Sequence, residues 1–338
     1  MHIGTRILLA LVLSACLVLT PHCKPKSTES EPAGKPTATP TAEEIAKAVE
    51  QLKSDKVDEL LAAAKIICQS DDEAAWKALQ EALVKEEVLN RLKAKVVDLG
   101  EEGGPAELRI PDFAQMMRII AEGKSDKATA TLMWLVDQKP YAETFAPENR
   151  DERKPWRSYL AYNAFEYIAE PSKDLLEYFS KKLESKTLSG DLRIRILEAL
   201  AAYGTPESLA LFKTQLWGYG QPILLVKHRN NYECVRLFLD TYRDLKESES
   251  AHKMLDSLFM ETYRESEFWP EEALPKINPQ GEEAKKFIDL FNGFLADPGK
   301  IALTEDETKK IKELIASIEK ANTEPSDNTD GAASDSNP

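Results

Sequence analysis

The chain has 338 residues, with 44 lysines and arginines against 58 aspartates and glutamates, so its formal net charge is −14 at pH 7. This excess of acid argues against a nucleic-acid-binding protein, because neutralising phosphates requires clustered lysine and arginine. With only 14 glycines, the chain is also poorly suited to glycine-rich nucleotide-binding folds and turn-dense β-barrels. The length suffices for one extended domain or two compact ones.

Residues 1–23 have the composition of an export signal. Arg6 precedes an apolar stretch that is too short to span a bilayer as a mature helix. Residues 13–16, with the sequence LSAC, resemble the lipobox of bacterial lipoproteins. The resemblance implies acylation of the Cys16 thiol, with Cys23 as the alternative, and therefore an anchor in the membrane. It places the protein at the bacterial cell envelope, periplasmic or surface-exposed; the alternatives are a cleaved signal with secretion, or an uncleaved anchor.

Two segments flank the predicted folded part. Residues 24–42 contain four prolines and six serines or threonines, with almost no apolar side chain to bury, and they are predicted to form a disordered tether. Residues 322–338 carry four acidic side chains and no lysine or arginine, which predicts a disordered acidic tail. A tether that follows an acylated cysteine would hold a folded module away from the lipid headgroups.

Residues 43–321 are predicted to be all-α. Apolar residues recur there at three- and four-residue steps, for example in the stripes at 57–68 and 113–120. The exception is the short apolar run at 223–226, which follows a proline and is the best candidate for a strand. Long irregular stretches at 139–154 and 265–280 interrupt the pattern, and each is either a functional loop or a subdomain boundary.

Start and stop signals accompany these helices. Three segments have the spacing of a capping box, in which a hydroxyl and a carboxylate three residues later satisfy free N–H groups. They are Thr41 with Glu44, Ser70 with Glu73, and Thr304 with Glu307. Glycines fall where periodic segments end, as a left-handed helix terminus favours: Gly100, Gly123, Gly190 and Gly204.

An internal repeat predicts the architecture. Residues 169–183 align with 202–216 at an offset of 33, and in both copies a turn with a proline leads into a helix with Leu, Phe and Leu at matching positions. Neither unit can bury its apolar face alone, so the units should stack. The segment 192–208 resembles a HEAT repeat, in which an Ala-Leu pair closes the first helix and a Gly-x-Pro turn leads into the second. The resemblance implies an α-solenoid of stacked helical hairpins.

The sequence contains no motif that predicts a catalytic centre, a cofactor site or a metal site. His-Glu-x-x-His, Cys-x-x-Cys and Gly-x-Ser-x-Gly are all missing. We expect His228 to be a solvated residue of a polar turn and His252 to be a surface residue near a helix start. Cys68 and Cys234 lie on apolar stripes, which predicts buried thiols, with a disulfide between them as the alternative.

Aromatic residues gather at one place in the sequence. Trp156, Tyr159 and Tyr162 recur at three-residue steps and so share one helix face. Packing in the core is the first interpretation, and an exposed strip that anchors a peptide or glycan partner is the second.

Together these features predict a membrane-tethered, non-catalytic helical-repeat scaffold that binds a protein partner in the bacterial cell envelope. One alternative is an envelope hydrolase that cleaves glycan or peptide with carboxylates from acidic clusters such as 71–73 or 271–272. The other is a structural lipoprotein that associates with its own copies.

Overall fold

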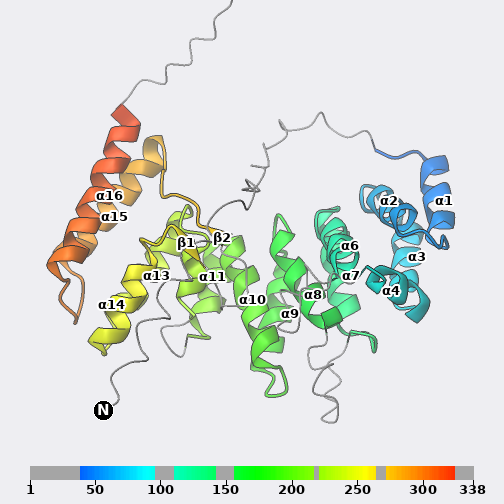
Figure 1. Cartoon of the computed structure of the whole chain (residues 1–338), viewed down its shortest axis with the longest axis horizontal. Coiled ribbons are helices and arrows are strands. Elements are labelled where there is room, and N and C mark those ends of the chain that lie inside the picture. The colour runs from blue at the N-terminus through cyan, green and yellow to red at the C-terminus, as the bar shows by residue number, and fades with distance from the viewer. Residues whose placement is uncertain (1–38, 96–109, 142–155, 217–220, 264–271, 324–338) are drawn as a thin grey trace, which may run out of the picture. The chain divides into compact units, whose positions relative to one another are not determined.

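The computed structural model describes residues 39–95, 110–141, 156–216, 221–263 and 272–323, and within these ranges the fold is all-helical (Figure 1). The predicted all-α class is therefore confirmed for the described residues. A single short antiparallel pairing joins β1 (Thr262–Tyr263) to β2 (Glu272–Ala273). No helix in the described ranges combines the length and the hydropathy that crossing a bilayer demands.

The helices in the first half of the chain are α1 (Ala42–Gln51), α2 (Val57–Cys68), α3 (Glu73–Leu83), α4 (Glu86–Lys93), α6 (Pro111–Ala121) and α7 (Ser125–Val136). Those that follow are α8 (Trp156–Asn163), the short 3-10 helix η2 (Ala164–Tyr167), α9 (Lys173–Glu184), α10 (Gly190–Tyr203) and α11 (Pro206–Lys213). The last are α12 (Ile223–Val226), α13 (Tyr232–Asp244), α14 (Ser248–Ser257), α15 (Gly281–Ala296) and α16 (Glu305–Thr323).

Two of the three predicted capping boxes form. Thr41 and Thr304 each exchange hydrogen bonds with the glutamate three residues later, at the starts of α1 and α16. The prediction for Ser70 is wrong, because the carboxylate of Asp72 caps α3 by accepting from the backbone N–H of Ala75 at 3.0 Å. The Ser70 hydroxyl instead donates to the carbonyl of Ile67 at the end of α2.

Glycines act in three different ways. Gly204 ends α10 with φ of 59°, as predicted, and a Cβ there would lie 2.3 Å from the Asn231 side chain. Gly123 follows the end of α6, but the left-handed conformation predicted for it is wrong, because its φ is not positive. Glycine is needed there for a close approach to α2, since a Cβ would lie 2.9 Å from that of Cys68. Gly190 does not end a helix: it is the first residue of α10, directly after the N-cap Ser189.

The two copies of the repeat have matching local structure. Ser172 caps α9 and Thr205, 33 positions later, caps α11, each accepting from the backbone N–H three residues on. Phe179 and Phe212, also 33 apart, are both fully buried. The strand candidate at 223–226 forms the short helix α12, in keeping with the all-α prediction for this part of the chain. A run of four apolar residues has no periodicity that separates a buried strand from a buried helical turn.

The helices form two series of contacts along the chain. In one series α2 contacts α6, α6 contacts α8 and η2, these contact α10, and α10 contacts α12. In the other, α3 contacts α7, α7 contacts α9, and α9 contacts α11. Helices α2 and α3, α6 and α7, and α10 and α11 also contact each other within their pairs, as do α15 and α16 near the C-terminus (Figure 1). Helix α13 contacts both α11 and α15 and so connects the second series to the C-terminal pair.

Several sequence predictions fall outside the described residues. These are the signal with Cys16 and Cys23, the tether up to residue 38, Gly100, residues 142–154 of the stretch at 139–154, residues 265–271 of the stretch at 265–280, and the tail from residue 324.

Candidate functional site

The predicted aromatic strip belongs to the core where the structure describes it. Tyr159 and Tyr162 are 5% and 3% exposed. The guanidinium carbon of Arg195 lies 4.6 Å from the centre of the Tyr159 ring, and Tyr162 packs on Phe165 at 5.9 Å between ring centres. These tyrosines therefore supply packing instead of an exposed anchor for a partner. Trp156 begins α8, but its side chain lies outside the described residues.

The two histidines among the described residues, His228 and His252, are both half-buried. His228 is half-buried, not solvated as expected, and burial lowers its pKa to about 4. The Nδ1 atom of His252 in α14 lies 2.7 Å from Oε1 of Glu307, a buried residue of α16. Among the described residues no three His, Cys, Asp or Glu side chains gather in a way that could hold a metal ion.

Cys68 and Cys234 are free and buried, as first predicted, and not joined to each other. The Sγ of Cys234 donates to the carbonyl of Ala201 at 3.4 Å, across the contact between α13 and α10. Burial raises the pKa of the Cys234 thiol to about 12, so at neutral pH it is a protonated packing group.

The acidic cluster at 71–73 is engaged in local contacts. Asp71 pairs with Lys124 at 2.7 Å, Asp72 caps α3, and Glu73 pairs with Lys127 at 3.3 Å. The three carboxylates thus point to three different partners, and they do not face one another across a cleft as glycoside cleavage requires. Glu271 of the second acidic cluster lies outside the described residues.

A small groove of about 250 Å³ lies where α6 meets α8 and η2. The guanidinium carbon of Arg118 lies 4.8 Å from the centre of the Tyr167 ring, and its Nε donates to Glu122 at 2.7 Å. The amide side chains of Gln115 and Asn163 also line this groove. A guanidinium stacked on a ring and flanked by two amides is well suited to the polar backbone of a peptide.

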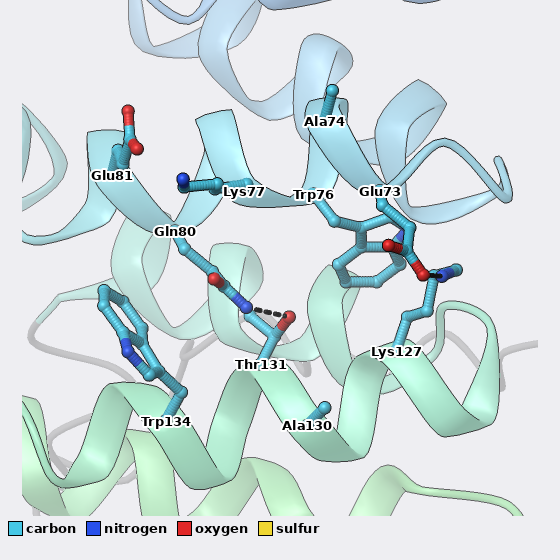
Figure 2. A pocket seen from close by; sticks show the side chains of 10 residues that line it. All are labelled: Glu73, Ala74, Trp76, Lys77, Gln80, Glu81, Lys127, Ala130, Thr131 and Trp134. Atoms are coloured by element: carbon cyan, nitrogen blue, oxygen red, sulfur yellow. Dashed lines mark hydrogen bonds and ion pairs between the residues drawn. The ribbon is translucent and has the colours of Figure 1, made fainter.

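A larger groove of about 610 Å³ lies between α3 and α7 (Figure 2). Figure 2 shows Trp134 on one side of a central hydrogen bond, which Gln80 donates to the Thr131 hydroxyl at 2.9 Å, and Trp76 on the other. Trp76 is buried, and its indole N–H donates to the carbonyl of Ser70 at 3.1 Å. Trp134 is 36% exposed. The groove therefore offers one accessible indole among polar side chains.

Sequence reasoning missed both grooves. Each is formed by helices that are far apart in the chain, so the spacing of residues within one helix gives no sign of it. The one available signal was a large apolar residue beside the buried face of α7. Trp134 is exposed, whereas its neighbour Leu135 is buried.

Comparisons of the chain with protein-family models, with curated proteins and with solved structures give no match. The assignment of function therefore depends on the residues and grooves described above.

Proposed function

We propose that this chain is a membrane-tethered, non-catalytic helical-repeat scaffold that binds a protein partner at the bacterial cell envelope. The solenoid arrangement is supported by the serial contacts of the helices, in which α2, α6, α8 and α10 contact one another in turn, as do α3, α7, α9 and α11. It is also supported by ion pairs between successive units, such as Asp71 with Lys124 and Asp137 with Lys182, the latter at 2.6 Å. Exposed pairs of this kind add little stability each, but they favour one register of stacking.

The observation that carries the proposal is the groove between α6 and η2. Its side chains are of the types that dominate protein interfaces, an arginine and a tyrosine, and Arg118 is exposed while Tyr167 is half-buried beneath it. Gln115 is exposed on α6 one turn before Arg118, and its amide can both donate to and accept from a peptide backbone. The partner is proposed to lay a peptide segment across these groups.

A photo-crosslinking residue at Gln115 tests this site in the source bacterium. We expect a discrete protein adduct, and we expect the additional substitution Arg118→Ala to reduce its yield by at least about tenfold. The same crosslinker at Lys286, which is exposed on α15, is the matched control. Adducts of the same size and yield from both positions, or an adduct that Arg118→Ala leaves unchanged, would contradict the proposed site.

The lipid anchor is tested separately by growth with an alkyne fatty acid. The wild-type chain and Cys23→Ser should carry the label, whereas Cys16→Ser should lose both the label and its membrane association. If Cys23→Ser loses the label and Cys16→Ser keeps it, the acylated residue is Cys23. A wild-type chain without label would refute the lipid anchor.

A further inference from the structure

The groove between α3 and α7 is built differently from the groove proposed for the protein partner. Glu73 faces Lys127 near the starts of the two helices and Gln80 faces Thr131 farther along, so α3 and α7 run in the same direction with the groove between them. Ala74 and Ala130 contribute only methyl groups to its lining. Its volume lies in the range of sites for small ligands.

The groove is poorly suited to an amphipathic helix. Its ten lining residues include no Leu, Ile, Val, Met or Phe, and the two tryptophans are the only large apolar side chains among them. A helix that docks into a groove needs apolar slots for side chains at successive turns, and these slots are missing here. The occupant must instead combine one apolar face with many polar groups.

Trp134 provides a flat surface for such an occupant. Its indole is 36% exposed and projects over the groove from the C-terminal half of α7 (Figure 2). The face of an indole ring carries partial negative charge, and the C–H groups on one face of a sugar ring carry partial positive charge, so the two stack. The hydroxyls of the sugar then point away from the ring toward polar neighbours.

Those neighbours supply both donors and acceptors. Lys77 can donate, Glu81 can accept, and the Gln80 amide, already hydrogen-bonded to Thr131, can do both. The lining holds two carboxylates and two ammonium groups and hence no net charge. A charged ligand would gain no net electrostatic attraction from a lining without net charge. Neutral vicinal hydroxyls, in contrast, can hydrogen-bond to both the carboxylates and the ammonium groups.

We infer that the groove between α3 and α7 binds a neutral oligosaccharide, with one sugar ring stacked on Trp134. This site is separate from the proposed protein site, which is built by α6, α8 and η2. A scaffold with both sites would connect a protein partner to a glycan of the cell envelope.

The test uses the full-length chain, titrated with chitotetraose, cellotetraose and maltotetraose and followed by calorimetry and tryptophan fluorescence. At least one of these neutral sugars should bind at submillimolar to millimolar concentration. Trp134→Ala should weaken binding by at least about tenfold and remove the fluorescence change. Trp134→Phe should restore part of the affinity, because a smaller ring still stacks. Met260→Ala is the matched control, since Met260 is an exposed apolar residue, 46% accessible, that does not line the groove.

Three results would overturn the inference. They are no binding of any of the three sugars at millimolar concentration, binding that Trp134→Ala leaves unchanged, and Trp134-dependent binding of tetragalacturonate or of a peptide in place of the neutral sugars. The far-UV circular dichroism of each variant should match that of the wild type, because position 134 lies on the surface. The crosslinking experiment at Gln115 is independent, so failure of one proposal leaves the other standing.

Discussion

Replacing Glu198 with alanine is expected to lower the free energy of unfolding by about 3–5 kcal/mol, the usual cost of removing one partner from a buried ion pair. Glu198 is 2% exposed in α10 and pairs with Arg195 of the same helix. It also accepts from the Nζ of Lys227, which follows α12, at 3.1 Å. Without the carboxylate, a buried guanidinium and a half-buried ammonium lose the negative charge that they share.

The loss of Glu198 should also weaken the contacts between helices. Arg195 lies against the Tyr159 ring of α8, so the cluster around Glu198 joins α8, α10 and α12. We expect Glu198→Ala to speed amide hydrogen exchange in all three, since stacked units are stabilised by their neighbours.

Urea unfolding followed by circular dichroism measures the effect, and Glu249→Ala is the matched control. Glu249 pairs with Lys253 at 2.7 Å, but both side chains are exposed, so its loss should cost less than about 1 kcal/mol. The double variant Arg195→Met/Glu198→Leu should be less destabilised than Glu198→Ala, because it removes the buried guanidinium together with the carboxylate and leaves only the half-buried Lys227 ammonium without its partner. Equal losses of unfolding free energy for Glu198→Ala and Glu249→Ala would show that the buried cluster stabilises the fold no more than an exposed ion pair does.

The sequence predicted well those features that depend on neighbours along the chain. The capping boxes at Thr41 and Thr304 and the left-handed Gly204 each require only a few consecutive residues. The repeat at offset 33 was recognisable because both copies use a hydroxyl cap and a buried phenylalanine. The helical class followed from periodicity.

Features that depend on tertiary contact could not be predicted in this way. Ser70 had the right spacing for a cap, yet Asp72, two residues later, directly precedes the start that α3 adopts. Nothing in the sequence around Glu198 indicated that it is a buried ion-pair residue, because its partner Lys227 comes from the segment after α12. The groove beside Trp134 joins residues more than fifty positions apart, such as Glu73 and Lys127. No motif within a single helix contains that information.

Arg229 is the second residue whose loss should be costly. It is 7% exposed, and burial lowers the pKa of its guanidinium, which nevertheless remains charged at neutral pH. Its partners are backbone carbonyls: Nε donates to Pro275 at 2.6 Å, and Nη1 donates to both Leu258 and Met260 at 2.6 Å. One side chain thus joins the end of α14 to the segment that follows β2.

Arg229→Met is expected to lower the free energy of unfolding by about 3–5 kcal/mol, because it keeps the apolar stem but leaves these three carbonyls without their charged donor. Arg229→Lys should recover only part of the loss, since a single ammonium does not reproduce the planar fork of the guanidinium.

Arg236→Met is the matched control: its side chain is 52% exposed and pairs only with Glu233 among the described contacts, so its loss should cost less than about 1 kcal/mol. Hydrogen exchange should accelerate first in residues 258–263, because their amides lie beside the carbonyls that Arg229 holds. The prediction fails if exchange in that segment is unchanged and Arg229→Met lowers the free energy of unfolding no more than Arg236→Met does. Water would then replace the guanidinium at the three carbonyls, and Arg229 would not be the residue that fixes this part of the fold.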